Sequence, residues 1–236
     1  MVMSNKARVF SHAFFLVFIA ALSMKAAASV VISGTRVIYS ADAKDVTVKL
    51  SNVGESPVLI QSWIDNGDPQ AKPENINVPF ILTPPINRVD AGKGQTLRLS
   101  YTGAALPTDK ESVFWLNVLE IPAKKALRAD ESALQMAFRS RIKLFFRPVG
   151  LSGNANDAAK ELNWSATAGG IKAFNPTPYF VSLVSLSVNG KEIEGQMIAP
   201  QSALEFNGLG AVAGKNLGVE FVNDHGAIHQ FEARVQ

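Results

Sequence analysis

The sequence predicts an all-β protein made of two immunoglobulin-like β-sandwich domains. Extended segments with apolar residues at alternate positions follow one another from Val30 onward, and this is the period of a strand with one buried face. No segment of helical length carries a convincing 3.6-residue apolar stripe. The stretch "RPVGLSGNANDAAK" interrupts the series with Pro, Gly and Asn. We therefore expect one domain over residues 29–149 and a second over residues 150–236.

The first domain contains seven extended segments between Val30 and Phe146. Turn signals such as "SADAKD", "NVGESP" and "DAGKGQ" separate them. Seven short strands at this spacing favour an immunoglobulin-like sandwich. Only "KKALRADESALQMAF" is ambiguous, because Ala, Leu, Arg and Glu favour helix. In order, the segments are "VVISGTRVIY", "DVTVKLSN", "VLIQSWID", "PFILTPPINRV", "TLRLSY", "VFWLNVLEI" and "LQMAFRSRIKLFFRP".

The second domain continues the strand-rich pattern after the interruption. Its predicted strands are "ELNWSAT", "GGIKAFNPT", "YFVSLVSLSV", "SALEFNG", "NLGVEFVND" and "IHQFEARV". Between two of them, "GLGAVAGKNLG" resembles a phosphate-binding loop, but the spacing is wrong and Asn216 stands where Ser or Thr would reach Mg²⁺. We expect a flexible connection there.

The first 28 residues are predicted to be a cleaved signal peptide. Lys6 and Arg8 precede the unbroken apolar run Ala13–Leu22, and small residues end the segment at Ala28. The alternative, a membrane anchor, is disfavoured because a span needs about 20 apolar residues. Cleavage after Ala28 would make Ser29 the first residue of an exported protein.

Removal of this leader changes the charge balance. Of the 23 basic residues, three lie in the leader, which leaves 20 against 20 acidic residues. Nucleic-acid binding by bulk charge therefore has no support. The chain has no cysteine, so its cores must hold without disulfides and no thiolate can act as nucleophile or metal ligand.

The sequence contains no motif with the residue types and spacing that catalysis or cofactor binding would require. His225 and His229 form H-x-x-x-H in a strand and turn context without an adjacent Glu, so we interpret them as surface histidines. No G-x-S-x-G nucleophile elbow is present. We expect no enzyme activity, no metal and no cofactor.

The segment "LQMAFRSRIKLFFRP" is unusually long for a strand, which typically has about 5–6 residues. One face carries apolar residues at every position from Leu134 to Phe146 except Ser140. The other face is strongly cationic, and we expect Arg139 and Arg141 on a solvated face. The alternation pattern alone leaves open what a strand this long, apolar on one side and basic on the other, contacts.

Several segments together resemble the PapD-like periplasmic pilus chaperones of the chaperone–usher pathway. The most specific are "LPTDKESVFWLNVLEIPA", where an acidic-basic-Glu-Ser run leads into an aromatic strand and Ile-Pro, and the long segment ending in "IKLFFRP". Supporting matches, in family order across nearly the whole mature chain, are "TRVIY", "SWID", "TPPINRV", "NPTPYF" and "FVNDHG".

This resemblance implies two immunoglobulin-like domains set at an angle with a cleft between them. It also implies a periplasmic chaperone that binds, folds and caps pilus subunits by donor-strand complementation and delivers them to an outer-membrane usher. In this sequence Leu134, Met136 and Phe138 would be the donor residues. From Ile142 onward the strand would stay in the chaperone's own sandwich. Self-association of two chaperones without a subunit stays open.

The resemblance also assigns two polar groups of residues. Arg36 and Lys143 match the cleft pair that anchors the subunit's C-terminal carboxylate, and charge-assisted hydrogen bonds suit this task. Glu111, Arg147 and Asp224 match an interdomain charge network in which one Arg between two acids would fix the hinge angle.

Departures from the family pattern bear on whether the chain resembles the short-loop or the long-loop class of these chaperones. Ala123 stands where a second proline is common, and the loop from Ile121 to Leu134 is moderately short. Long-loop members carry a cysteine pair near this loop, so its absence favours the short-loop class. The alternatives are an immunoglobulin-like secreted adhesin or structural binding module, which would not need the Arg36–Lys143 pair, and a periplasmic enzyme.

Overall fold

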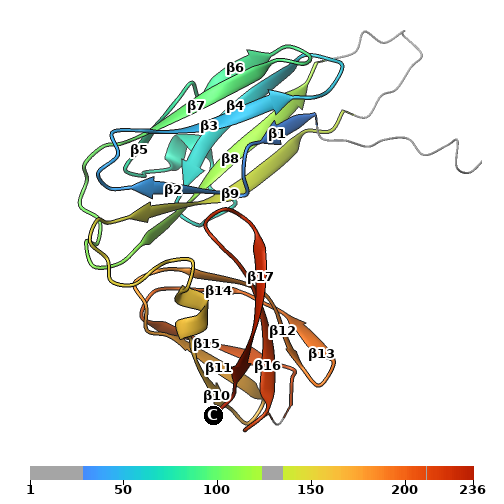
Figure 1. Cartoon of the computed structure of the whole chain (residues 1–236). Coiled ribbons are helices and arrows are strands. Elements are labelled where there is room, and N and C mark those ends of the chain that lie inside the picture. Colours follow the sequence, from blue (N-terminus) through green and yellow to red (C-terminus); the bar gives the residue numbers. More distant parts are fainter. Residues whose placement is uncertain (1–28, 124–134, 211) are drawn as a thin grey trace, which may run out of the picture.

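The computed structural model describes residues 29–123, 135–210 and 212–236. Figure 1 shows β1–β9 in one lobe and β10–β17 in the other. The only helices in the described residues are the short 3₁₀ turns η1 (Pro73–Asn75) and η2 (Ala158–Glu161), and no helix there is long and apolar enough to cross a membrane. The strands are β1 (Val30–Ile32), β2 (Arg36–Ser40), β3 (Val46–Asn52), β4 (Val58–Asp65), β5 (Phe80–Thr83), β6 (Ile86–Val89), β7 (Gly94–Tyr101), β8 (Ser112–Pro122), β9 (Phe138–Arg147), β10 (Asn163–Ala166), β11 (Gly170–Asn175), β12 (Val181–Val188), β13 (Lys191–Glu194), β14 (Met197–Ile198), β15 (Ser202–Asn207), β16 (Asn216–Val222) and β17 (Ile228–Arg234).

The first lobe is a sandwich of two sheets. One has the order β1-β3-β7-β5 and the other β2-β9-β8-β4-β6. Alternate residues of both sheets point inward, as in β3, where Val48 and Leu50 are buried. Their inner faces enclose one core that also includes Leu99, Leu116 and Leu144. The predicted all-β fold of two sandwiches is confirmed by this lobe together with the second lobe described below.

Two predicted strands are each split between the two sheets. "VVISGTRVIY" forms β1, which pairs with β3, and β2, which pairs with β9. The break falls at Gly34, whose φ of +111° lies in a region that residues with a side chain rarely adopt. "PFILTPPINRV" likewise forms β5 and β6 in opposite sheets, because Pro84 and Pro85 between them have no N–H for a ladder.

Strand β9 is shorter than the sequence pattern predicts. Its ladder with β8 begins where Phe138 faces Glu120, and residues 135–137 are outside any strand. Leu134 lies outside the described residues, as does most of the segment that could be helix or strand. Strand β2 pairs with β9 in parallel, but only from Lys143 to Arg147. Within the part of the chain that the structure describes, the first half of β9 therefore pairs with β8 alone.

The second lobe is also a sandwich, with one sheet ordered β10-β11-β15 and another ordered β13-β12-β16-β17, in which β14 also pairs with β12. Strands β13 and β14 were not predicted from the sequence, although the Asn189-Gly190 dipeptide before β13 is a strong hairpin signal. The connection predicted to be flexible is packed, because Leu209 and Val212 are buried in the second core.

We expect a residue inside β9 and a residue just before it to differ strongly in their contribution to stability. Leu144 is 0% exposed and Met136 is 54% exposed. Leu144→Ala should lower the free energy of unfolding by about 2–5 kcal/mol through lost burial and a cavity. Met136→Ala should change it by about 0.5 kcal/mol or less. Urea unfolding of both variants measures this contrast, and equal losses would contradict it.

Candidate functional site

A pair of cations lies between the two lobes. Arg36 begins β2 and faces Lys143 directly in the parallel β2–β9 register. The Arg36 Nη1 donates to the carbonyl of Val222 at 3.0 Å, and the Lys143 Nζ lies 3.3 Å from the Ser182 hydroxyl. Both partners belong to the second sandwich. The structure therefore brings the predicted cleft pair together at the junction of the domains.

Arg36 and Lys143 are half-buried and lack an acidic partner within 4.0 Å in the described part of the chain. Burial lowers the pKa of Lys143, and the charge of Arg36 lowers it further. Burial also lowers the pKa of Arg36, although Asp224 and Glu111 counteract it. The Arg36 Nε is buried without a hydrogen-bond partner. Two adjacent cations with an unused donor favour binding of an anion such as a carboxylate.

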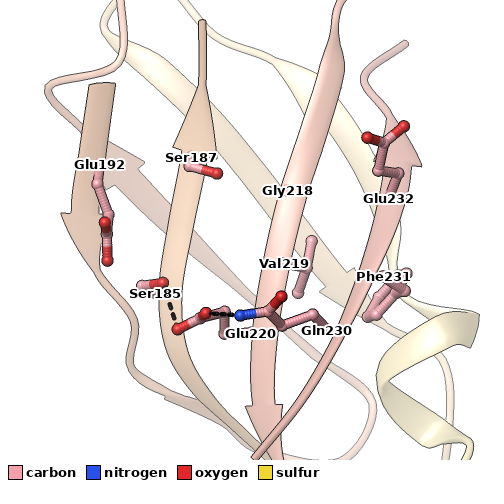
Figure 2. A pocket seen from close by; sticks show the side chains of 9 residues that line it. All are labelled: Ser185, Ser187, Glu192, Gly218, Val219, Glu220, Gln230, Phe231 and Glu232. Atoms are coloured by element: carbon pink, nitrogen blue, oxygen red, sulfur yellow. Dashed lines mark hydrogen bonds between the residues drawn. The ribbon is translucent and has the colours of Figure 1, made fainter. Parts of the chain in front are cut away.

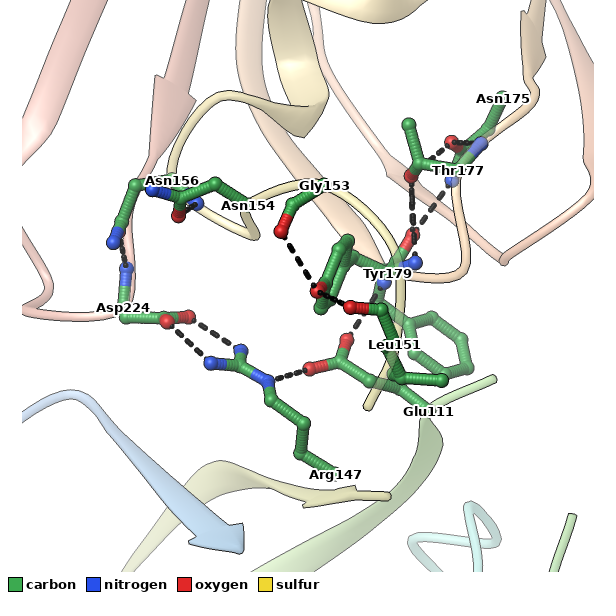
Figure 3. Close-up of polar contacts among 11 residues, drawn as sticks. Glu111, Arg147, Leu151, Gly153, Asn154, Asn156, Asn175, Thr177, Tyr179 and Asp224 are labelled. Carbon is green, nitrogen blue, oxygen red and sulfur yellow. Dashed lines mark hydrogen bonds and ion pairs between the residues drawn. The ribbon is translucent and has the colours of Figure 1, made fainter. Parts of the chain in front are cut away.

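Arg147 joins the two sandwiches through two acids (Figure 3). Its Nε donates to Glu111 Oε1 at 2.6 Å, and its two terminal nitrogens donate to Asp224 at 2.7 and 2.9 Å. Glu111 precedes β8 in the first sandwich, whereas Asp224 follows β16 in the second. Burial opposes the charge on Arg147, but the hydrogen bonds and charges of both acids raise its pKa. A planar guanidinium with bidentate contacts fixes direction as well as distance.

Glu111 is itself tied to the second sandwich. Its Oε2 accepts the Phe180 N–H at 2.8 Å, and its own N–H donates to the carbonyl of Pro178 at 2.9 Å. Burial raises the pKa of Glu111, while Arg147 and the Phe180 N–H counteract the rise. The Tyr179 ring lies 5.3 Å from the Arg147 guanidinium carbon. The network is therefore a buried joint rather than an exposed surface pair.

Of the predicted donor residues, Phe138 begins β9 and Met136 lies just before it. Met136 is 54% and Phe138 is 44% exposed, and Leu134 lies outside the described residues. Farther along the same face, Ile142 is partly buried and Leu144 and Phe146 are buried in the first core. One apolar face thus passes from solvent into a core within a single strand.

The prediction that Arg141 lies on a solvated face is wrong. Its guanidinium binds Asp65, which is 1% exposed, at 2.9 and 2.5 Å, and stacks 4.5 Å from the Trp115 ring. Burial alone would raise the pKa of Asp65, but hydrogen bonds from Arg141, Asn117 and the Gly67 N–H lower it. Arg139, by contrast, is exposed and donates to the carbonyl of Pro69. The Arg141–Asp65 contact holds the outer half of β9 against β8 and β4.

A separate pocket lies on the second sandwich, across β12, β16 and β17 (Figure 2). Glu192, Glu220 and Glu232 line it, and Glu220 accepts hydrogen bonds from Ser185 and Gln230. This acidic lining does not suit an anion. The described residues contain no group of three or more His, Cys, Asp or Glu that could hold a metal ion, and His229 contacts the Asn223 amide instead.

Two family comparisons match the chain. The family described as "Pili and flagellar-assembly chaperone, PapD N-terminal domain" matches residues 29–152. "Pili assembly chaperone PapD, C-terminal domain" matches residues 157–233.

Individual proteins are similar over most of the chain. The chaperone protein FimB/FhaD of Bordetella pertussis is 46% identical over 228 residues, which is 92% of each chain. The crystal structure of the Pseudomonas aeruginosa CupB2 chaperone is 38% identical with a TM-score of 0.76, covering 87% of this chain and 100% of that one. The Salmonella enterica SafB chaperone, solved in complex with the SafA pilin, is 30% identical with a TM-score of 0.78, covering 89% and 98%.

We expect Arg147→Ala to destabilise the protein and loosen the joint between the sandwiches. Removing the cation leaves Glu111 buried without its partner, at a cost of about 2–4 kcal/mol, below a fully buried pair because Arg147 is partly exposed. Calorimetry measures the loss, and small-angle scattering should show a broader range of interdomain arrangements.

Arg88→Ala is the matched control for this change, because the Arg88–Asp90 pair is exposed. Its effect should be about 0.5 kcal/mol or less. A similar loss in both variants would contradict a special role of Arg147.

Proposed function

Because this chain belongs to the PapD-like family of pili assembly chaperones, we propose that it binds, folds and caps pilus subunits in the periplasm and delivers them to an outer-membrane usher. The observation that carries the proposal is the pair of half-buried cations, Arg36 and Lys143, which have no acidic partner within 4.0 Å among the described residues. The pair stands where the paired half of β9 meets its open half. The class of partner follows the related SafB, which binds a pilin.

The open half of β9 is the proposed donor strand. Among the described residues, only β8 pairs with β9 from Phe138 to Ile142, so one row of backbone groups is available to a further strand. A subunit that lacks its last strand would add its own edge there by β-augmentation. Met136 and Phe138, with Leu134, would fill the apolar groove that such a subunit leaves open.

The cation pair is the proposed anchor for the subunit's C-terminal carboxylate. A carboxylate has two acceptor oxygens and could bind the Arg36 guanidinium and the Lys143 ammonium together. It would also relieve the repulsion between the two like charges. The Glu111–Arg147–Asp224 network would hold the sandwiches at the angle that keeps this position accessible.

Export is part of the proposal. We place the end of the leader at Ala28 and the division between the domains at residues 149 and 150. The solved relative SfaE, 34% identical, is a periplasmic chaperone. A short loop between β8 and β9 stays a prediction, because residues 124–134 lie outside the described part. Without a subunit, the open edge and apolar residues of β9 could also pair two copies of the chaperone.

Replacing either anchor cation should abolish subunit capture without unfolding the protein. Arg36→Ala and Lys143→Ala remove half of the carboxylate contacts, each worth about 1.5–3 kcal/mol. Co-purification of the cognate subunit from the periplasm, measured beside thermal unfolding, tests this. Normal capture would disprove the anchor, and loss of fold alone would show that these residues are structural.

Subunit affinity should fall as pH rises through the lowered pKa of Lys143. This change should begin below the ordinary lysine pKa of 10.5. Burial and Arg36 lower the pKa of Lys143 in the free chaperone, and a bound carboxylate favours the charged form. Binding is therefore strongest below the lowered pKa and weakens as pH rises through it. Binding titrations across the alkaline range check this. In Lys143→Arg the profile should be flat, because Arg stays charged, and an equal decline in that variant would contradict the assignment.

Met136→Glu should weaken subunit binding far more than it destabilises the free chaperone. A carboxylate forced into an apolar groove loses its hydration without a partner, at a cost of several kcal/mol. In the free protein the same side chain stays in water, where substitutions change stability by about 0.5 kcal/mol. Thermal unfolding and subunit binding of the variant are compared. Gross unfolding of the free variant would show that Met136 belongs to its own core.

A further inference from the structure

A buried carboxylate lies against the first residue that the structure describes. Glu120, which is 7% exposed, accepts hydrogen bonds from the Ser29 backbone nitrogen at 3.3 and 3.1 Å, from the Val30 nitrogen at 2.9 Å and from the Ser29 hydroxyl. Both oxygens of one side chain, near the end of β8, are thus directed at the start of β1.

The fold is shaped to receive Ser29 at this position. The Ser29 carbonyl accepts the Val53 N–H at 2.7 Å. A Cβ added to Gly54 would lie 2.6 Å from the Ser29 Cβ, closer than real Cβ contacts allow. A hydrogen bond on one side and the missing side chain of Gly54 on another therefore fix where the chain begins its first strand.

The charge of Glu120 has no cationic side chain beside it in the described part of the chain. Among the described residues, no Lys, Arg or His side chain lies within 4.0 Å of it. A buried carboxylate normally requires a cationic partner or a full set of donors. In the unprocessed chain the Ser29 nitrogen is a neutral amide with one hydrogen. After cleavage at Ala28 it becomes an ammonium with three hydrogens and a positive charge.

We propose that Glu120 is the binding site for the amino-terminal ammonium of the processed chain, so that leader removal completes a buried ion pair at the start of β1. The proposal depends on the cleavage site placed above and not on subunit binding. It assigns to Glu120 the role of a positioning residue for β1 in the exported protein.

The ion pair has a consequence for the open edge of β9. If the chain before Arg36 simply continued the parallel register with β9, Val31 would lie opposite Phe138 and the first residues would cover the whole open half. Instead Val31 lies opposite Ser51 of β3, in the other sheet. The contact with Glu120 holds β1 in that sheet and thereby keeps the donor edge free.

The test compares two forms of the processed chain, residues 29–236, that differ only at the amino group. Cytosolic expression suits this chain because it has no cysteine. The initiator Met is removed before Ser29, and a co-expressed acetyltransferase yields the acetylated form, which mass spectrometry verifies. Both forms are made in the parent chain and in Glu120→Gln, which keeps the shape and loses the charge. Acetylation should lower the unfolding midpoint of the parent by about 3–8 °C, and that of Glu120→Gln by less than half as much.

No effect of acetylation in the parent, or an equal effect in both backgrounds, would overturn the proposal. Should Glu120→Gln not fold, Gly54→Ala serves as the second background, because it displaces Ser29 and should also reduce the acetylation effect; an unreduced effect overturns the proposal. Subunit capture is measured separately on the unmodified chain. Its failure would overturn the proposed function and leave the ion pair standing.

Discussion

A backbone N–H or C=O must find a partner or remain in water, and strand β9 meets this requirement differently along its length. From Lys143 to Phe146 it is paired on both sides, with β8 and with β2, whereas from Phe138 to Ile142 β8 is its only partner among the residues that the structure describes. The inner half is a central strand of a sandwich and the outer half is an edge. The difference arises because the chain leaves this sheet before Arg36 and joins the opposite one as β1. An edge of this kind is an aggregation hazard in most proteins, and in this chain the Arg36–Lys143 pair lies where the edge begins.

Charge at the junction of the sandwiches has two separate forms. Arg147 is neutralised by Glu111 and Asp224, and the result is a satisfied, direction-specific joint. Arg36 and Lys143 lie beside each other on neighbouring strands, and their hydrogen bonds within the described residues go to neutral groups of the second sandwich. A satisfied network contributes to shape, whereas two close like charges repel each other and would be stabilised by an anion between them, which is the basis of the proposed carboxylate anchor. One interface therefore combines a charge network that links the two sandwiches with a cation pair that would suit an anionic ligand.

Local pattern in the sequence predicted which residues of β9 face inward but not where its ladder stops. Leu144 and Phe146 alternate as a strand requires and are buried. The first ladder pair, Phe138 with Glu120, depends on the tertiary position of β8, which local alternation does not report. The splits at Gly34 and at Pro84-Pro85 were missed because a break in a strand and a change of sheet look the same in sequence.

Ion pairs were harder still to predict. Arg147 and its acids were found only through resemblance to a family, since Asp224 is 77 positions away. Arg141 looked like a solvated cation because Asp65, its partner, is 76 positions away, and no periodicity reports such a distance.

The direct pairing of Arg36 with Lys143 has a further effect on any strand that binds beside β9. If Arg36 and Lys143 hold the terminal carboxylate of a subunit as proposed, that contact fixes the register of the incoming strand relative to β9. A slip of one residue would turn every side chain to the opposite face, so a chain with one residue more or fewer after its last strand would present the wrong face to Met136 and Phe138. The chaperone would then select subunits by the number of residues between their last strand and their C-terminus, as well as by the side chains of that segment.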